Sequence, residues 1–422
     1  MSLSTRSNAV LAASSGSIMW EVMANLYDPV TNPTGYYSVG VAENVLMHDE
    51  LLAHIHDHFR LTSKYLTYND GASGSKRLKT AMARFLTQHL HPTRPLDPGH
   101  LLLTNGVSAA VEHLSWALAD AGEGILLGRP YYGTFIADIG LRFGTEVVAV
   151  DFQGQDPLGT TCVDAYRRAM TDFTARTGKK VRALLLCHPH NPLGRCYPRS
   201  VIIELMRLCQ EHRMHFISDE IYALSIWGST DAGTGFESAL SIDTTGIIDA
   251  DRVHVLWGMS KDFGANGLRL GAIISTNDRV RAGVDSAALY SYVAGPSDHI
   301  SASVLEDDAF TAAYIHANNE KLAAAYEYTV QLLEQHNIPY MAGTNAGFFI
   351  WVDLGTPFLQ RHPEAVHVNV SDEVMQRLLK ERVFLASGAL FGSETPGWFR
   401  IVFAHPRDYL AEALRRVVAA IE

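Results

Sequence analysis

The sequence predicts an α/β protein: a large domain with a mostly parallel seven-stranded sheet covered by helices, plus a smaller α+β domain. Seven short apolar runs between residues 100 and 275 end in turn residues and alternate with segments of helical periodicity. This pattern is typical of strands that are buried on both faces of a parallel sheet. A long helical pattern at Asp307–Leu333 separates these runs from two later ones, which we assign to the second domain.

The strands expected in the large sheet are short and nearly continuous in apolar residues. They are Leu101–Leu103, Gly124–Leu127, Val147–Val150, Val181–Leu186, His215–Ile217, Val253–Leu256 and Leu268–Ile274. In sheets of this kind the ligand binds at the carboxyl ends of the strands. The residues that follow each run are therefore candidates for a site.

The flanking segments complete the domain assignment. Helices are expected at Leu46–Phe59 and Ser75–Leu90, whereas residues 1–45 have turn signals and read as an irregular arm. In the C-terminal part we expect strands at Gly347–Val352 and Trp398–Phe403, and helices at Ser371–Glu381 and Asp408–Ile421. We assign 1–45 to an arm that joins the small domain, 46–310 to the large domain, and 311–422 to the small domain, which begins with the inter-domain helix.

Composition excludes several classes of protein. The 422-residue chain is 47% hydrophobic and 19% charged, which is ordinary for a soluble enzyme. Its net charge of −11 argues against nucleic-acid binding, which requires a basic face. Four cysteines are too few to imply a disulfide framework. No apolar run approaches the roughly 18 residues that span a bilayer, and the Ser/Ala-rich N-terminus lacks a secretory core. We expect a cytoplasmic protein.

One lysine lies between two of the predicted strands. Lys261 follows Ser260, and Arg269 follows eight residues later, with glycines between them that allow tight turns. A lone lysine in a loop is usually a solvated surface charge. A lysine that is partly desolvated instead loses proton affinity and becomes an amine nucleophile, while a nearby arginine can clamp a phosphate. The pair suggests Schiff-base chemistry on a phosphorylated carbonyl cofactor.

Other strand ends carry groups that such a cofactor would use. Ser108 lies where a helix is expected to begin, a place that suits a phosphate, although many such turns carry Ser as a plain cap. Tyr132 could stack on an aromatic ring or simply pack in a core. Burying the charged carboxylate of Asp219 at a strand end would cost free energy unless a cation lay beside it. A protonated pyridine nitrogen would be such a cation. Tyr222 could donate to a phenolate oxygen, and Asn191 is held in a rigid turn.

Two histidine-containing segments also raise the possibility of a metal site. The stretch from Cys187 to His190 shows no second ligand pair at a fitting spacing. Among His54, His56 and His58, only His54 and His58 would share a helix face, and the sequence shows no third ligand. We therefore predict no metal.

Together these residues resemble the site of a fold-type-I pyridoxal 5′-phosphate (PLP) enzyme. The chain resembles the class I/II aminotransferase superfamily from about residue 24 to 410, and within it the 1-aminocyclopropane-1-carboxylate (ACC) synthases and their fungal relatives. The segments that carry the resemblance are Asn32-Pro33-Thr34-Gly35, Gly40-Val41-Ala42-Glu43-Asn44, His190-Asn191-Pro192-Leu193-Gly194, Ser260-Lys261-Asp262 and Pro396-Gly397-Trp398-Phe399-Arg400.

The resemblance implies a role for each candidate residue. Lys261 would form the Schiff base and shuttle the Cα proton, and Asp219 would pair with the pyridine nitrogen. Tyr222 and Asn191 would bind the ring oxygen, while Tyr132 would stack on the ring. The phosphate would be held by Val107, Ser108, Arg269 and, from the other subunit of a homodimer, Tyr68. Arg400 would bind the substrate carboxylate, with Gly40 and Glu43 lining the substrate side.

The chain departs from the family pattern at two places. The family's Ser-x-Ser-Lys reads Gly258-Met259-Ser260-Lys261, so one phosphate hydroxyl is missing. The family's Tyr-His-Gly-Leu-Pro segment reads Tyr68-Asn69-Asp70-Gly71-Ala72-Ser73, with one extra residue close to the substrate. The second departure leaves room for a substrate other than that of ACC synthase.

Three functions follow from these observations. The preferred one is a PLP-dependent lyase that cleaves a C–S bond of a sulfur-containing amino acid. Its outcome would be either ACC-synthase-like ring closure or cysteine-conjugate cleavage, as in fungal secondary metabolism. The alternative is an aminotransferase that moves the amino group to a 2-oxo acid. A catalytically inactive scaffold is disfavoured because Lys261, Asp219 and Arg400 are all present.

Overall fold

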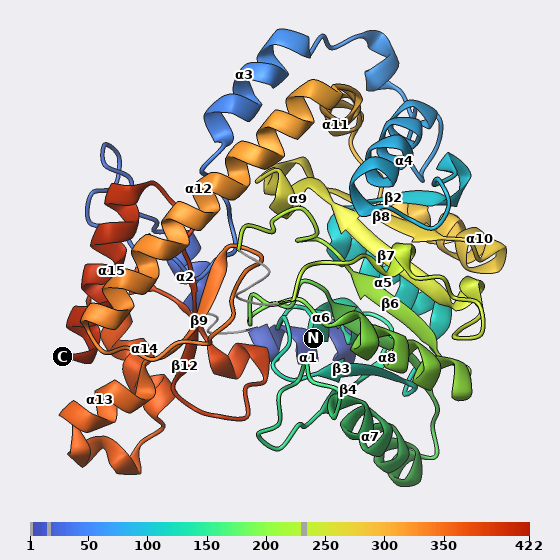
Figure 1. The fold of residues 1–422 in the computed structure, drawn as a ribbon. Helices are drawn as coiled ribbons and strands as arrows, with labels where there is room; N and C mark the ends of the chain where they lie inside the picture. Colours follow the sequence, from blue (N-terminus) through green and yellow to red (C-terminus); the bar gives the residue numbers. More distant parts are fainter. Residues whose placement is uncertain (1–2, 15–17, 229–233) are drawn as a thin grey trace.

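A seven-stranded sheet forms the centre of the larger part of the molecule. The computed structural model describes residues 3–14, 18–228 and 234–422 (Figure 1). The strand order is β2-β8-β7-β6-β5-β3-β4. The strands are β2 (Leu101–Asn105), β3 (Gly124–Gly128), β4 (Glu146–Val150), β5 (Val181–Cys187), β6 (His215–Asp219), β7 (Val253–Gly258) and β8 (Leu270–Ser275). The predicted seven-stranded α/β sheet is confirmed.

All the pairings in this sheet are parallel except those of β8, which runs antiparallel to both β2 and β7. Alternate strand residues pack on opposite faces, as in β5, where Leu184 and Leu186 join one core cluster and Ala183 and Leu185 join another. Helices α5 (Gly106–Leu118), α6 (Phe135–Gly140) and α10 (Asp278–Ala287) cover one face. The other face carries α4 (Lys76–Leu90), α7 (Cys162–Thr177), α8 (Arg199–Glu211) and α11 (Gly295–Glu306). Burial on both faces explains why the strands are apolar throughout.

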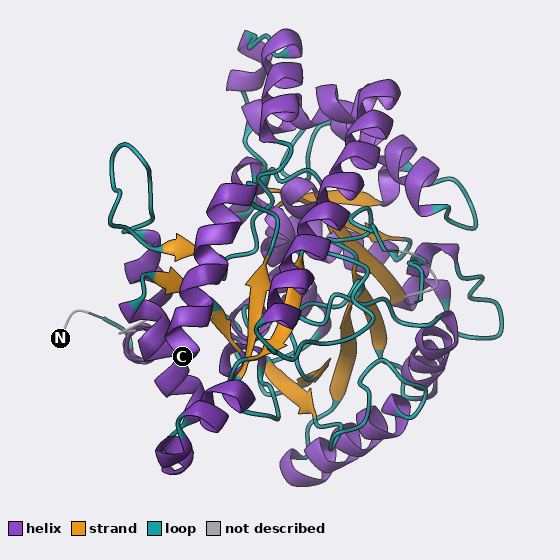
Figure 2. Cartoon of the chain, turned by 60° about the vertical axis from the view of Figure 1, so that its left-hand side comes forward, coloured by secondary structure: helices purple, strands orange, loops and turns teal. Residues whose placement is uncertain are grey.

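A second core is built by the C-terminal third of the chain together with the N-terminal segment. The long helix α12 (Asp308–Gln335) leads to an antiparallel sheet of β11 (Ala386–Ser387), β12 (Trp398–Val402) and β9 (Phe349–Asp353). Helices α13 (Gly355–Arg361), α14 (Val370–Lys380) and α15 (Arg407–Ile421) pack around it. Figure 2 shows this group of helices and strands beside the large sheet. The domain boundaries proposed at residues 45 and 310 stay a prediction.

The N-terminal arm is more regular than the sequence suggested. It contains α1 (Thr5–Ser14) and α2 (Ile18–Met23), where we expected irregular structure. Sequence periodicity gave no signal because α1 is rich in Ser and Ala and has little apolar asymmetry. Strand β1 (Tyr37–Ser38) pairs in parallel with β10 (Val383–Phe384), so the start of the chain is anchored in the C-terminal core.

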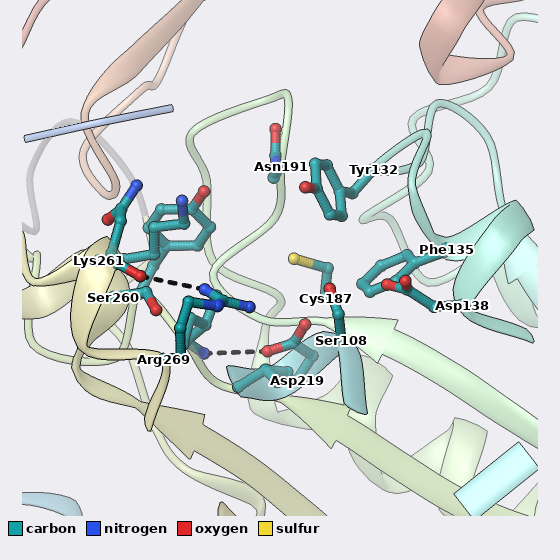
Figure 3. A pocket seen from close by; sticks show the side chains of 14 residues that line it. Ser108, Tyr132, Phe135, Asp138, Cys187, Asn191, Asp219, Ser260, Lys261 and Arg269 are labelled. Carbon is teal, nitrogen blue, oxygen red and sulfur yellow. Dashed lines mark hydrogen bonds between the residues drawn. The ribbon is translucent and has the colours of Figure 1, made fainter. Parts of the chain in front are cut away.

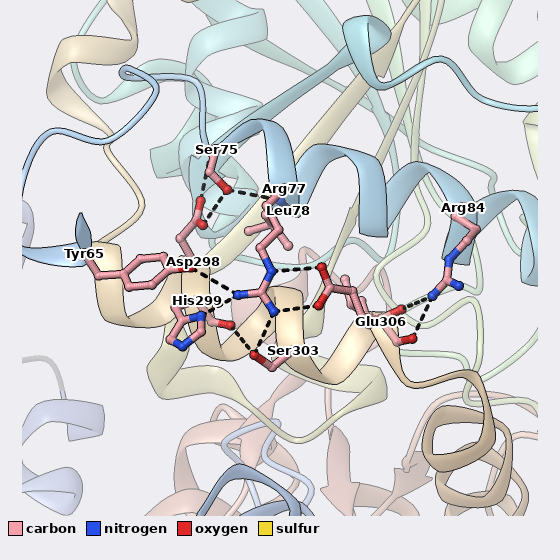
Figure 4. A network of polar contacts seen from close by, with 10 residues as sticks. Tyr65, Ser75, Arg77, Leu78, Arg84, Asp298, His299, Ser303 and Glu306 are labelled. Atoms are coloured by element: carbon pink, nitrogen blue, oxygen red, sulfur yellow. Dashed lines mark hydrogen bonds and ion pairs between the residues drawn. The ribbon is translucent and has the colours of Figure 1, made fainter. Parts of the chain in front are cut away.

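A polar network fixes the segment that leads into α4. Arg77 donates to both carboxylate oxygens of Glu306 and to the hydroxyl of Tyr65 (Figure 4). Ser75 caps α4 and donates from its hydroxyl to buried Asp298 on α11 over 2.6 Å. These contacts hold residues 63–77 against α11.

None of the described helices is long and apolar enough to cross a membrane.

Candidate active site

A pocket opens where the strands of the large sheet end, as the topology predicts. Most of the residues singled out from the sequence line it, and they lie at or shortly after the ends of five different strands (Figure 3). The predicted residues in the lining are Val107, Ser108, Tyr132, Asn191, Asp219, Tyr222, Lys261 and Arg269. Side chains separated by more than 150 residues in the sequence therefore share one cavity.

Lys261 lies directly after β7, on the single turn α9 (Met259–Asp262). Its Nζ donates to the carbonyl oxygen of Ala42 over 2.6 Å. Burial lowers the pKa of this amine to about 8, with the positive charge of Arg400 acting in the same direction and Glu43 acting against it. Much more of the amine is consequently neutral near neutral pH than in an ordinary lysine.

The next residue, Asp262, holds this turn in place. Its Oδ2 accepts from the backbone nitrogen of Leu224 and from Nε1 of Trp257, and its Oδ1 accepts from the hydroxyl of Ser225. Burial raises the pKa of Asp262 to about 7, opposed by these hydrogen bonds. The backbone of Lys261 is thereby tied to the loop that follows β6.

Asp219 occupies the carboxyl end of β6 and is only 4% exposed. Its Oδ1 accepts from the backbone nitrogen of Ile221 over 3.2 Å. Burial raises its pKa to about 7, and the negative charge of Asp138 adds to that effect. This hydrogen bond offsets little of the cost of burying the carboxylate charge, so a cation bound in the pocket would suit Asp219. Tyr222 follows on the same turn, where it is fully buried between the rings of Phe348 and Phe349.

The N-terminus of α5 and Arg269 form a cradle for an anion. Asn105 precedes the helix without a side-chain cap, so the first backbone N–H groups are available to a ligand. Gly106 has a φ of 80°, and a Cβ there would lie 2.4 Å from Nη2 of Arg269. A Cβ on Gly271 would lie 2.6 Å from the nitrogen of Val107. Both glycines are therefore needed for the close approach of strand, helix and guanidinium.

The structure also explains the glycine that replaces a family serine. Gly258 faces Gly271 across β7 and β8, and a Cβ at Gly258 would lie 2.4 Å from the carbonyl oxygen of Leu270. A serine would not fit there without moving β8. Glycine at this position therefore removes a hydroxyl from the site and allows β7 and β8 to pack closely.

Arg400 reaches the site from β12 of the smaller sheet and is 3% exposed. Its Nη1 donates to Oδ1 of Asn191 over 2.9 Å, and its Nη2 donates to the carbonyl oxygen of Gly40 over 2.6 Å. Its Nε is buried without a partner among the described residues. The guanidinium lies near the rings of Phe349 and Phe391. A buried cation with a spare donor fits a carboxylate ligand.

Tyr132 lines the pocket, whereas Glu43 and Tyr68 do not belong to its lining. Tyr132 packs edge-on against Phe135, and burial raises its pKa. Glu43 is half-buried, close enough to Lys261 for its charge to act on the amine. Tyr68 lies outside the pocket of its own chain, where it is 84% exposed and its ring is 6.1 Å from that of Tyr292.

Further residues line the pocket that were not predicted to be part of it. They are Phe135, Asp138, Cys187, Ile221, Ser260 and Asn266. Asn266 offered a signal, because it lies in the glycine-rich segment between the two predicted cations, and its Nδ2 donates to Ala42. Asp138 offered none, because it lies on the short helix α6. Burial raises its pKa to about 7, opposed by a hydrogen bond with Ser108 and by the charge of Arg269.

The model of the family "Aminotransferase class I and II" matches residues 40–417. The chain belongs to the class I and II aminotransferases. It is 32% identical over 393 residues to 1-aminocyclopropane-1-carboxylate synthase 3 of Oryza sativa subsp. japonica, covering 90% of this chain and 85% of that protein. It is also 32% identical to "Probable aminotransferase gliI" of Aspergillus fumigatus, covering 89% and 87% of the two chains. A Mus musculus relative at 30% identity, covering 93% and 67%, is named "Probable inactive 1-aminocyclopropane-1-carboxylate synthase-like protein 2".

Solved structures agree on the fold. A double mutant of Thermus thermophilus aspartate aminotransferase superimposes with a TM-score of 0.76 at 19% identity, covering 100% of both chains.

Class I and II aminotransferases and ACC synthases depend on PLP. The residues of this pocket fit that cofactor, because an under-compensated buried carboxyl, an amine with a lowered pKa and a glycine-built anion cradle meet in one cavity.

Proposed function

We propose that this enzyme is a PLP-dependent lyase that cleaves a C–S bond in a sulfur-containing amino acid. The observation that carries the proposal is the surroundings of Arg400. Its unpartnered Nε is available to one carboxylate, and the rings beside it, Phe349 and Phe391, are apolar. The other cations at the pocket, Lys261 and Arg269, are needed for the amine and phosphate roles. Among the described residues, the pocket lining therefore offers no further cation for a second substrate carboxylate, and aromatic rings suit a polarisable sulfur.

The cofactor would be held at both ends by this chain. The N–H groups at the start of α5, the hydroxyl of Ser108 and the guanidinium of Arg269 would bind the phosphate. Asp219 would accept a hydrogen bond from the pyridine nitrogen, and Tyr222 and Asn191 would bind the ring oxygen. Bound PLP supplies an electron sink for the electron pair released at the substrate Cα.

The remaining residues would position the substrate and move its proton. Arg400 fixes the carboxylate and thereby directs the Cα–H bond toward Lys261. The neutral Nζ of Lys261 takes the Cα proton. The C–S bond then breaks, and sulfur leaves with the bonding electrons, as a thiolate after β-cleavage or as a thioether after γ-cleavage with ring closure onto Cα. Gly40 and Glu43 line the side from which the substrate enters.

An aminotransferase is the second candidate, and the relative named as an aminotransferase favours it. In that reaction Lys261 would move the Cα proton without loss of sulfur, bound PLP would supply the carrier for the amino group, and a 2-oxo acid would accept that group. The same residues would serve both reactions, so the difference lies in whether the substrate carries a sulfur leaving group on Cβ or Cγ.

The proposal includes a homodimer with shared sites. Exposed apolar side chains on two adjoining segments support it: Leu66 (72% exposed), Tyr68 (84%), Leu289 (63%) and Tyr290 (77%). Such a patch is typical of an interface. In the dimer, Tyr68 would reach the phosphate in the partner's pocket.

The test is to incubate the holoenzyme separately with S-adenosylmethionine, with a cysteine S-conjugate, and with an amino acid plus a 2-oxo acid. Products are identified by mass spectrometry. Release of a thiol or thioether without transfer of nitrogen supports the lyase. Stoichiometric conversion of the oxo acid into an amino acid would establish the aminotransferase instead. Failure of the protein to develop cofactor absorbance, or of borohydride to fix the cofactor on Lys261, would exclude both.

A further inference from the structure

Two histidines that the sequence left without a chelating partner lie beside an aspartate from a distant part of the chain. His54 and His58 are one turn apart on α3 (His48–His58), and Asp307 precedes α12. One ligand atom from each residue lies within 4.8 Å of the other two. We propose that these three side chains form a binding site for a divalent transition-metal ion, with Zn²⁺ as the best match.

The hydrogen bonds at this site leave suitable ligand atoms available. Nδ1 of His58 donates to the carbonyl oxygen of His54 over 2.8 Å, so Nε2 of the neutral ring keeps its lone pair for a metal. Such a contact sets the tautomer of a metal-binding histidine in many proteins. Oδ1 of Asp307 caps α12 by accepting from Phe310, whereas Oδ2 faces Nε2 of His54 at 3.2 Å. The carboxylate therefore caps the helix through one oxygen and faces the imidazole of His54 with the other.

A simple ion pair accounts for this arrangement less completely. His54 is 7% exposed, and its contact with Asp307 through Nε2 leaves Nδ1 without a hydrogen-bond partner among the described residues, as metal binding through Nε2 would. An ion pair would also need only one imidazole. His58 places a second one against it, with the ring centroids 4.2 Å apart, and Phe310 packs on His54 at 3.9 Å.

The composition of the site selects the ion. Two imidazole nitrogens and one carboxylate oxygen suit Zn²⁺ or its neighbours in the first transition series, and water completes a tetrahedron. Mg²⁺ and Ca²⁺ prefer oxygen ligands alone. Ligand atoms about 2 Å from a common Zn²⁺ must approach one another more closely than 4.8 Å. His58 is exposed, so a turn about its side-chain torsions closes the site without moving the core.

The bound ion would link two elements that flank the catalytic part of the chain. Helix α3 precedes the large sheet, and Asp307 marks the point where the chain leaves α11 and enters α12 (Figure 1). Metal that binds the folded protein and not the unfolded chain raises thermal stability. The expected role is therefore a structural clasp, independent of the proposed reaction.

The test uses PLP-loaded full-length protein, titrated with Co²⁺ as a visible probe and with Zn²⁺ in competition. We expect saturation at one equivalent per chain, visible absorption beyond that of the cofactor, and a rise in the melting temperature with Zn²⁺. His58→Ala and Asp307→Asn should weaken binding by at least about tenfold. Asparagine remains a good helix cap, and His58 is exposed, so both variants should fold.

The chain supplies matched controls. His56 lies on the same helix but away from the site, and His316 faces only Glu320 at 3.3 Å on the surface of α12. His56→Ala and His316→Ala should bind Co²⁺ as the unaltered protein does. Absence of saturable binding would overturn the proposal. So would binding that persists in both His58→Ala and Asp307→Asn, or that His56→Ala weakens equally.

Discussion

Nη1 of Arg400 donates a hydrogen bond of 2.9 Å to Oδ1 of Asn191. The bond connects β12 of the smaller sheet to the loop that follows β5 of the larger one. Arg400 is our candidate for the substrate carboxylate and Asn191 for the cofactor oxygen. One hydrogen bond therefore links the two proposed binding functions. A substitution at either residue should alter both substrate binding and cofactor binding.

Arg400→Lys should raise KM strongly and leave the cofactor bound. Lysine keeps the charge but loses the planar fork and its contact with Asn191. Loss of one charge-assisted hydrogen bond corresponds to a fall in kcat/KM of roughly 10- to 100-fold. The measurement is steady-state kinetics with the substrate found in the product screen. Arg407→Lys, at an exposed position on α15, serves as the control and should change nothing. An unaltered KM in Arg400→Lys would contradict the carboxylate role.

Lys261→Ala should bind PLP without covalent attachment and without turnover. The phosphate cradle and Asp219 remain, but no amine is left to take the Cα proton, so the rate should fall by about 10²- to 10⁴-fold or more. Absorbance spectroscopy reports the cofactor, and mass spectrometry after borohydride treatment reports its attachment. Lys321→Ala, which removes a surface lysine bonded to Glu50, is the control. Activity retained in Lys261→Ala would remove this residue from the mechanism.

The lowered pKa of Lys261 predicts the pH dependence of cofactor attachment. The amine must be neutral to react with the aldehyde, and its pKa lies at about 8 rather than 10.5. The rate at which apoprotein recaptures PLP should rise about tenfold per pH unit below pH 8 and level off above it. Stopped-flow absorbance measures this directly. A rate that still climbs steeply toward pH 10 would show that the amine behaves as an ordinary lysine.

Gly258→Ser should weaken the site rather than restore the family's hydroxyl. The new Cβ would meet the carbonyl oxygen of Leu270 at 2.4 Å, so β8 must shift and carry Arg269 with it. Overpacking of this kind costs about 1–3 kcal/mol of stability, and PLP affinity should fall with it. Denaturant unfolding and cofactor titration measure the two effects. Gly267→Ser, in the same segment but with open space around its Cβ, is the control. Tighter PLP binding in Gly258→Ser would refute the steric argument.

Asp262 should make the protein less stable as the pH rises toward neutrality. Its pKa in the folded protein is about 7, above the ordinary 3.8, so the folded state holds a proton that the unfolded state has lost. The contribution of this group to stability is therefore greatest at low pH and falls between about pH 4 and 7. Asp262→Asn should flatten this part of the profile while losing about 1–3 kcal/mol from an unmatched buried amide. Urea unfolding across that range is the measurement, and an unchanged slope would contradict it.

The large sheet was predictable because its strands are local, apolar runs. Each predicted strand overlaps its observed counterpart, with Val253–Leu256 extending to Gly258 and Leu268–Ile274 beginning two residues later at Leu270. The rule that ligands bind at strand ends predicted that Asn191, Asp219 and Lys261 would lie together, and the structure places β5, β6 and β7 side by side, with all three residues in one pocket.

What the sequence could not provide is contact between distant segments. The hydrogen bond from Lys261 to the carbonyl oxygen of Ala42 depends on how the N-terminal arm packs. No sequence motif identifies a backbone oxygen as such a partner. Asp307 next to His54 depends on the junction of α11 and α12. The tight approach of Gly258 to β8 is a property of packing, although the departure from the family pattern pointed to the position.

The arm has a consequence for the order in which the protein matures. Carbonyl oxygens of Gly40 and Ala42 contact Arg400 and Lys261, so the pocket closes only when residues separated by 360 and 219 positions have met. A chain emerging from the ribosome can assemble the sheet before β12 exists, since early segments fold first. Arg400, the proposed ligand for the substrate carboxylate, is then still missing. The proposed carboxylate contact of Arg400 therefore requires that β12 has been synthesised, and the nascent protein passes through a stage with a sheet but no finished pocket.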